Sequence, residues 1–171
     1  LTDSEPESDG TDHQPSGKHA YVSACARLRI VPSSHVLGRL SSDRLSLRNA
    51  MLSPASAEAL SAGLAANHCI RSLNLGSNFL GDEVAGTLLE AVSCNGSLTR
   101  LDLSRNSLGN SFGILLAETL SSPASTVREL VVAENLLSDV FVEALSEGMR
   151  KRTSPSSLRS LDASSNNISD R

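Results

Sequence analysis

One short pattern of leucines with a single asparagine recurs along this chain, and it constrains the fold more than any other feature. The unit reads L-x-x-L-x-L-x-x-N-x-L, with other aliphatic residues at some of the L places. Full copies begin at four positions: Ile70, Leu98, Val127 and Leu158. A weaker copy begins at Ser42 and has Ala50 at the asparagine place. The steps between starts are 28, 28, 29 and 31 residues, a register that chance does not keep over such a length.

Each unit divides into a strand and a helix. The leucines at the fourth and sixth places point to the same side of a strand, because strand side chains alternate between two faces. In the second half of the unit, apolar residues four apart, such as Leu60 and Leu64, share one helix face. Successive strands then pair in parallel, each returning through a helix. Because helices are about 10 Å wide and strands are spaced about 4.8 Å apart, the stack curves with its strands inside.

The sequence therefore predicts an α/β fold: a right-handed solenoid, a horseshoe segment with short parallel strands on the concave face and helices on the convex face. The pattern resembles the ribonuclease-inhibitor-like class of leucine-rich repeats over residues 42–171. Within that class, the leader at residues 21–37 is similar to the leader of the leucine-rich-repeat-containing protein 74 family. The chain departs from the class pattern at Ala50, at Ala163 and in its longer fourth unit.

The chain divides into three segments. Residues 1–18 are an acidic tail with five carboxylates in the first twelve positions, and we expect disorder there because little apolar surface offsets the ordering entropy. Residues 19–41 are expected to form a helical N-terminal cap, with Ser33 or Ser34 capping its second helix. Residues 42–171 hold four repeat units and the strand of a fifth. Because that unit has no helix and the chain has no initiator Met, we expect a fragment or processed chain whose repeats continue.

Asparagines stand where the strands end. The ninth place of four units holds Asn78, Asn106, Asn135 and Asn166. We expect a structural ladder in which these amides bond the backbone of their own and neighbouring units. Replacing Asn106 by alanine is accordingly predicted to cost on the order of 1–3 kcal/mol, by leaving buried peptide groups unpaired.

The candidate partner-binding residues are strand side chains that face the concave surface. The row at the third place of the units is Arg44, Ser72, Arg100, Glu129 and Ser160. The row at the fifth place is Ser46, Asn74, Asp102, Val131 and Asp162. Just past the strands lie Arg48, Arg105 and Glu134. These rows are short, polar and mixed in sign, without the Trp or Tyr anchors of many interfaces, so a plain solvated face stays open as the alternative.

Charge and composition narrow the class of function. The net charge is −4, without the clustered Lys and Arg that contact phosphates, so a nucleic-acid partner is not expected. We find no catalytic constellation and no cofactor motif, and the four histidines have no metal-ligand spacing. The sequence favours a non-catalytic scaffold that binds a protein partner, whose identity it leaves open.

Other functions follow from the resemblance. Ran-type GTPase-activating proteins use this repeat class and present an arginine on a loop, which Arg48 or Arg105 would supply here. Regulation of a phosphatase is a related alternative. Ribonuclease inhibition would need a strongly acidic concave face, and the mixed rows argue against it.

Cysteine usage and hydropathy bear on location. The three cysteines have no disulfide-framework spacing, which favours reduced thiols and a cytoplasmic location, and the family resemblance implies a ciliary or centrosomal one. No apolar run reaches the roughly 20 residues of a membrane span, so no membrane insertion is expected.

We expect a monomer, with pairing through the exposed last repeat left open. Ser4, Thr153 and Ser154 lie in kinase-site surroundings, with plain solvated segments as the alternative.

Overall fold

The computed structural model describes residues 16–152 and 155–169 of the chain. Its strands are β1 (Arg44–Ser46), β2 (Ser72–Asn74), β3 (Arg100–Asp102), β4 (Glu129–Val131) and β5 (Ser160–Asp162). Its helices are α1 (Lys18–Arg27), α2 (Ser34–Arg39), α3 (Pro54–Ala65), α4 (Gly81–Cys94), α5 (Asn110–Ser121) and α6 (Asp139–Lys151). From β1 onward strands and helices alternate one by one, with the period of the repeat.

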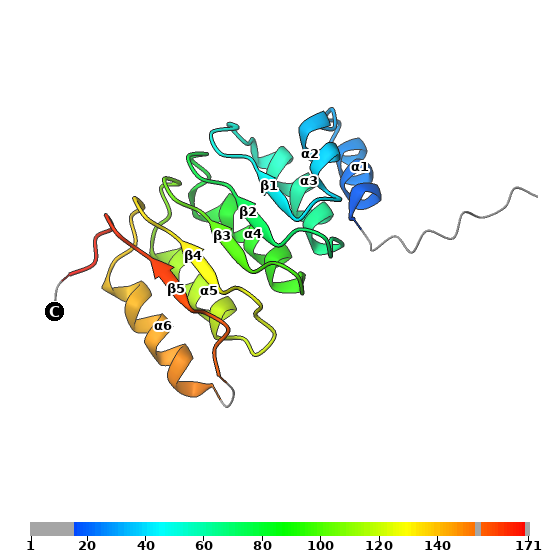
Figure 1. Ribbon diagram of the computed structural model, residues 1–171. Helices are drawn as coiled ribbons and strands as arrows, with labels where there is room; N and C mark the ends of the chain where they lie inside the picture. The colour runs from blue at the N-terminus through cyan, green and yellow to red at the C-terminus, as the bar shows by residue number, and fades with distance from the viewer. Residues whose placement is uncertain (1–15, 153–154, 170–171) are drawn as a thin grey trace, which may run out of the picture.

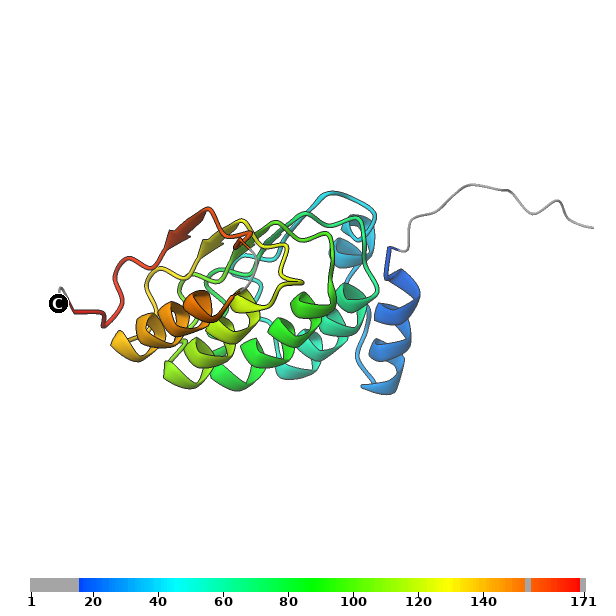
Figure 2. The same ribbon diagram turned by 90° about the horizontal axis from the view of Figure 1, so that it is seen from below.

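The five strands form one parallel sheet in the order β1-β2-β3-β4-β5. The fourth-place leucines stand opposite one another in register: Leu45, Leu73, Leu101, Leu130 and Leu161. Figure 1 shows the sheet in front of helices α3 to α6, and Figure 2 shows the strands and helices as two layers. The predicted α/β solenoid is confirmed, with strands on the concave face and helices on the convex face.

The core lies between the two layers and consists of the leucines that the repeat places there. Leu73, Leu101 and Leu130 are at most 2% exposed, and the sixth-place Leu75 and Leu103 are buried to the same extent. A single unit cannot cover both sides of its leucine layer, so each unit relies on its neighbours for burial. At roughly 25 cal/mol per Å² of apolar surface, this stacking is the main source of stability.

The N-terminal cap packs on the open side of the first unit. Helix α1 buries Tyr21, Ala24 and Cys25. The Tyr21 hydroxyl accepts the Ser33 backbone N–H at 3.0 Å, which ties α1 to the start of α2. Of the two serines that the sequence left open, Ser33 is the N-cap of α2, and Ser34 is the first helical residue.

The cap also includes three residues that were predicted to belong to the acidic tail. Helix α1 begins at Lys18, and Ser16 forms a bridge with Asn67. Between them Gly17 has a φ of 70°, and a methyl group there would collide with the Gly63 carbonyl oxygen. Only glycine fits this backbone approach, so the boundary of the cap lies before residue 18.

The ninth-place asparagines bond the backbone under the strand-to-helix loops. The Asn106 Oδ1 accepts two backbone N–H groups of the preceding unit, and its Nδ2 donates to three carbonyl oxygens. Asn78 and Asn135 bond in the same way, and all three are at most 6% exposed. Asn166 continues this ladder at the last turn, where it is only half-buried.

A second set of side chains satisfies the helix-to-strand turns at the opposite edge of the sheet. The Asn95 Nδ2 donates to the carbonyl oxygens of Leu64 and Asn67 at 2.8 and 2.6 Å. Asn67 makes equivalent bonds to the cap, at 2.7 and 2.6 Å. In the fourth unit the Arg152 guanidinium takes this place and donates to two carbonyl oxygens at the end of α5, at 2.9 and 3.0 Å. The repeat pattern did not reveal these positions.

The last unit is less buried than the others. Among the residues of α6, all of which the structure describes, Phe141 alone is fully buried. Leu161 of β5 is 39% exposed, because no described strand lies beyond it. The C-terminal layer is therefore the weakest part of the described solenoid.

Candidate functional site

The candidate residues of β1 to β5 line one continuous concave face. The third-place side chains stand at the strand starts: Arg44, Ser72, Arg100, Glu129 and Ser160. The fifth-place side chains stand at the strand ends: Ser46, Asn74, Asp102, Val131 and Asp162. Every one of these ten side chains is half-buried or exposed. The structure thus brings the two rows together on one accessible surface.

Several fifth-place side chains also hold the strand ends in shape. The Asp102 Oδ1 accepts the Ser104 backbone N–H at 3.0 Å and the Ser104 hydroxyl at 2.7 Å. Its Oδ2 accepts the Asn74 Nδ2 at 3.0 Å from the neighbouring strand. Asp162 forms the same two bonds with Ser164. These side chains have a local structural role in addition to facing the concave side.

The Asp162 carboxylate gives this face a defined response to acid. Hydrogen bonds from the Ser164 hydroxyl and backbone lower the pKa of Asp162 below its usual 3.8. Because the pKa of Asp162 is lower in the folded chain than in the unfolded chain, the ionised carboxylate stabilises the fold at pH values above the unfolded-state pKa. This stabilisation is lost as the pH falls through the folded-state pKa. We therefore expect the Ser164 amide signal in an NMR titration to stay constant down to about pH 4 and to shift only below it. A midpoint at or above 3.8 would contradict the observed bonds, and Asp162→Asn should abolish the shift.

Two ion pairs cross from the third unit to the fourth on this side of the molecule. Arg100 pairs with Glu129 and Arg105 pairs with Glu134, each at 2.7 Å. The hydrogen bond to Glu134 raises the pKa of Arg105 above its usual value. All four side chains are about half-exposed, so the pairs add little to stability and mainly neutralise the middle of the face. Arg48 has no ion pair with any residue that the structure describes.

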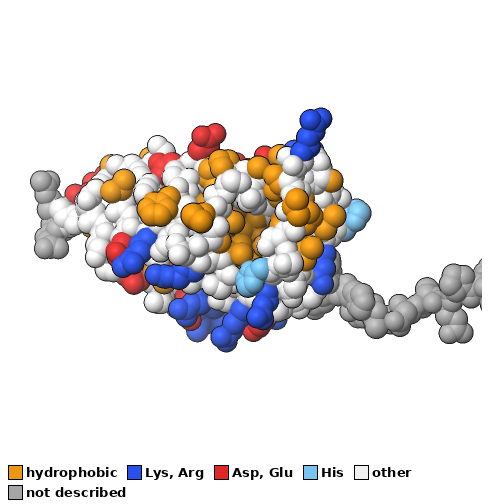
Figure 3. Space-filling model, turned by 90° about the horizontal axis from the view of Figure 1, so that it is seen from above, with side chains coloured by type: hydrophobic (Ala, Val, Ile, Leu, Met, Phe, Trp, Pro, Cys, Tyr) orange, Lys and Arg blue, Asp and Glu red, His pale blue; other side chains and the backbone are white. Residues whose placement is uncertain are grey.

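A groove at the strand-to-helix edge carries two large apolar side chains that the sequence rows omitted. Phe79 and Leu136 are 79% and 55% exposed and flank the unit that holds Ser107. The hollow between them is about 530 Å³ in volume, and the Arg105–Glu134 pair contributes to its lining. We call this hollow, with Phe79, Ser107 and Leu136, the Phe79 groove. Figure 3 looks onto this edge and shows hydrophobic side chains spread over it, with Lys and Arg gathered along one border.

Neither packing nor backbone preference explains an aromatic residue at position 79. Phe79 has a φ of 53°, in the left-handed region where large side chains are rare. Holding a residue there costs roughly 1–2 kcal/mol. The exposure of Phe79 means that burial does not offset this cost. The same left-handed turn recurs at Met51 and Ser107, so it belongs to the repeat loop, and it is the exposed ring that makes Phe79 the first candidate for partner contact.

The rows predicted from the sequence follow the strands and therefore do not include this edge. The tenth place of the units holds Met51, Phe79, Ser107, Leu136 and Asn167. Large apolar residues at a loop position were the available signal. Whether they face the core or the solvent depends on the path of the loop, which turns through left-handed residues such as Ser77 and Phe79.

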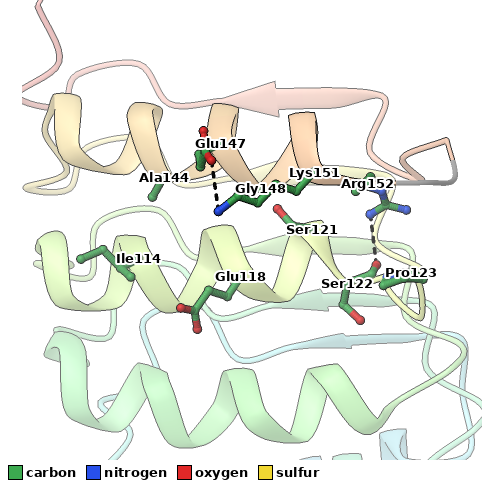
Figure 4. Close-up of a pocket in the computed structure, with 10 residues that line it drawn as sticks. All are labelled: Ile114, Glu118, Ser121, Ser122, Pro123, Ala144, Glu147, Gly148, Lys151 and Arg152. Carbon is green, nitrogen blue, oxygen red and sulfur yellow. Dashed lines mark hydrogen bonds and ion pairs between the residues drawn. The ribbon is translucent and has the colours of Figure 1, made fainter.

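A second hollow of about 490 Å³ lies on the convex side between α5 and α6, as Figure 4 shows. Gly148 of α6 faces Ser121 of α5 there, and a methyl group on Gly148 would collide with the Ser121 side chain. Glu147 on the rim pairs with Lys151 at 3.1 Å. The polar groups of this hollow do not converge as the residues of a catalytic site do, and we assign no function to it.

Other site types can be assessed over residues 16–152 and 155–169. There, no group of three or more His, Cys, Asp or Glu side chains is placed to hold a metal ion. No helix in these ranges is long and apolar enough to cross a membrane. The three cysteines, all within these ranges, form no disulfide, and Cys25 is buried. Ser4, Thr153 and Ser154 lie outside the described residues.

Comparisons with known proteins agree with this architecture. Two models of the leucine-rich repeat match the sequence, over residues 66–85 and 97–119. No curated protein matches it. Among solved structures, the chain is similar to "Leiomodin-1 Actin-Binding Site 2 (ABS2)", with 15% identity and a TM-score of 0.61, over 71% of this chain and 69% of that one. At this identity the likeness shows the fold alone, and no match supports the narrower protein 74 resemblance.

Proposed function

We propose that this leucine-rich-repeat protein is a non-catalytic scaffold whose concave face and Phe79 groove bind a protein partner. Proteins of this repeat class generally mediate protein–protein interaction, which supports the broad part of the proposal. The observation that carries the narrower part is Phe79 itself. It is an exposed aromatic residue beside a hollow of about 530 Å³.

The lining of the groove defines the chemistry of the partner. Phe79 and Leu136 form apolar walls, while Ser107 and the Arg105–Glu134 pair supply polar groups between and beside them. An extended protein segment would place one apolar side chain between the walls and bond its backbone to the polar rim. Exposed aromatic anchors of this kind carry a large share of interface energy.

Capture of partners from a cell extract, quantified by mass spectrometry, tests the groove with two matched variants. Phe79→Ser removes the ring from a side chain that is 79% exposed, so the fold should persist. Loss of an aromatic anchor costs about 2 kcal/mol, which corresponds to an affinity about thirtyfold weaker. Ile114→Ser, at a site 42% exposed on the convex side, should leave capture unchanged.

Equal capture by the wild-type chain and Phe79→Ser would overturn the groove as the binding site. A loss confined to Ile114→Ser would move the partner to the convex hollow instead.

Purified actin is a useful additional probe, because the solved chain of similar fold is titled an actin-binding site.

Regulation of a GTPase is the second candidate, and Arg48 is the arginine that we propose for it. Arg105 is held by Glu134 at 2.7 Å, whereas Arg48 is exposed and has no ion pair within the described part of the chain. Arg48 is therefore the residue that a GTPase could contact. A GTP hydrolysis assay with the wild-type chain and Arg48→Ala tests this role, and an unchanged rate with the wild-type chain excludes it for the GTPases assayed. No observation distinguishes a phosphatase as the target.

We propose that the protein is a monomer and that it lies in the cytoplasm. A ciliary or centrosomal location is the narrower form of this second proposal. Cysteines that form no disulfide in the described chain suit a reducing compartment. Light scattering of the purified chain tests the monomer, and a fluorescent fusion in cells tests the location.

A further inference from the structure

Four arginines form a row along the edge where the strands begin. This arginine row consists of Arg71, Arg100, Arg128 and Arg159, and each is exposed. The backbone links between units place them at the starts of successive strands, β2 to β5. Arg128 N–H donates to the Thr99 carbonyl at 2.7 Å, and Arg159 N–H donates to the Arg128 carbonyl at 2.8 Å. Neighbouring strands are about 4.8 Å apart, so the row holds four cations within three strand spacings.

The charges along this edge are not balanced by the described residues. Arg100 pairs with Glu129, whereas Arg71, Arg128 and Arg159 have no ion pair within residues 16–152 and 155–169. Arg71 and Arg100 line a hollow of about 540 Å³, to which only two carboxylates contribute, those of Asp43 and Glu129. Like charges on adjacent strands repel one another, so an anionic occupant would stabilise this edge.

The chain itself contains a segment of the required charge. Five of its 19 carboxylates lie in residues 1–12, which contain no Lys or Arg. The other 159 residues therefore hold 14 carboxylates against 15 Lys and Arg side chains. The acidic residues of the segment are Asp3, Glu5, Glu7, Asp9 and Asp12. The negative net charge of the protein comes entirely from this segment.

The attachment point of the segment lies at the same edge as the arginine row. The Ser16 carbonyl accepts the Asn67 Nδ2 at 2.6 Å, and Asn67 precedes Arg71 by four residues. Asp12 can extend about 14 Å from Ser16, and Asp3 about 45 Å, at roughly 3.5 Å per residue. The distance across three further strands is only about 15 Å, so the carboxylates can reach the whole row.

We propose that residues 3–12 lie across the arginine row and pair their carboxylates with the guanidinium groups of Arg71, Arg100 and Arg128. The site is an anion-binding surface for an acidic peptide segment, and its occupant is the acidic N-terminal segment of the same chain. It lies at the opposite edge of the sheet from the Phe79 groove, so the two proposals succeed or fail separately.

NMR spectra of the full chain test this contact against a tail-neutral variant. That variant carries five substitutions: Asp3→Asn, Glu5→Gln, Glu7→Gln, Asp9→Asn and Asp12→Asn. We expect the amide signals of Arg71, Arg100 and Arg128 to differ between the two proteins at low salt. The difference should vanish near 0.5 M NaCl, because salt screens exposed charges. Coincident spectra at low salt would overturn the proposal.

A synthetic peptide of residues 1–15 provides the second measurement. A tethered segment competes at an effective concentration of about 1 mM, so the peptide should bind the wild-type chain about tenfold more weakly than the tail-neutral variant. Adding Arg71→Gln and Arg128→Gln to that variant should weaken peptide binding about tenfold. The matched control Arg150→Gln, on α6, should leave it unchanged. Equal binding to the wild-type and tail-neutral chains would overturn the proposal.

Dilution distinguishes the same chain from a second copy. Signal positions that stay constant from about 500 to about 10 μM protein support a contact within one molecule, since an intramolecular event does not depend on concentration. Positions that move toward those of the tail-neutral variant on dilution would assign the occupant to another molecule and contradict the proposal.

Discussion

Replacing Asn106 by alanine is expected to lower the free energy of unfolding by about 3 kcal/mol, at the upper end of the range predicted from the sequence. The side chain is fully buried and makes five hydrogen bonds. Its Oδ1 accepts the backbone N–H groups of Asn78 and Leu80, and its Nδ2 donates to the carbonyl oxygens of Leu75, Leu103 and Ser104. Alanine leaves the backbone N–H groups of Asn78 and Leu80 buried without their partner, whereas the three carbonyl oxygens keep hydrogen bonds from other donors. Urea unfolding followed by circular dichroism measures the loss.

Two further substitutions separate the hydrogen bonds from side-chain volume. Asn106→Asp keeps the volume but directs an oxygen at three carbonyl oxygens, so it should destabilise the fold at least as much as alanine. Asn166→Ala removes the same kind of side chain from a half-buried turn, where solvent replaces the lost partners, and should cost about 1 kcal/mol. An Asn106→Ala midpoint equal to that of the wild type would show that the ladder carries no stability.

Replacing Phe141 by alanine is expected to remove about 4 kcal/mol, and most of that loss should appear in the last unit. Phe141 is 0% exposed and is the fully buried residue of α6. It packs over Gly113 of α5, where an added methyl group would lie 3.0 Å from the Phe141 Cβ. In a solenoid each unit contacts only its neighbours, so a terminal unit that loses its anchor can unfold alone.

Hydrogen exchange measured residue by residue tests this prediction. Amides of α6 and β5 should lose their protection in Phe141→Ala, while amides of β2 and β3 should keep theirs. Val142→Ala, next to it in sequence but 42% exposed, should change protection by less than about 0.5 kcal/mol. Uniform loss of protection along the whole chain would mean that the units unfold together, contrary to the expectation for stacked repeats.

The repeat pattern predicted most of the architecture correctly because it combines two independent periods. Leu73 and Leu75, two residues apart, indicated a strand face, while Leu60 and Leu64 indicated a helix face. Their recurrence at steps near 28 residues predicted the parallel register that the sheet shows. The N-terminal boundary was less accurate, because the contact between Gly17 and Gly63 joins segments that no local pattern relates.

The candidate site was less predictable than the fold. The strand rows were placed on one face, but the sequence did not show that Arg105 pairs with Glu134 or that Asp102 holds Asn74 and Ser104. It also missed Phe79, because a loop residue has no periodic signal to indicate which way its side chain points. The hydrogen bonds that the Asn95 side chain makes at the helix-to-strand turn were not predicted for the same reason.

The sequence by itself determined that this chain stacks strand-and-helix units, since burial of aliphatic side chains at fixed intervals admits one arrangement of the backbone. Only the tertiary structure decided which polar and aromatic side chains meet across neighbouring units. These side-chain contacts join residues a whole repeat apart, as with Arg100 and Glu129. They also depend on left-handed loop turns such as the one at Phe79. Local periodicity carries information about burial, whereas contacts between side chains of different units require the strands to be stacked first.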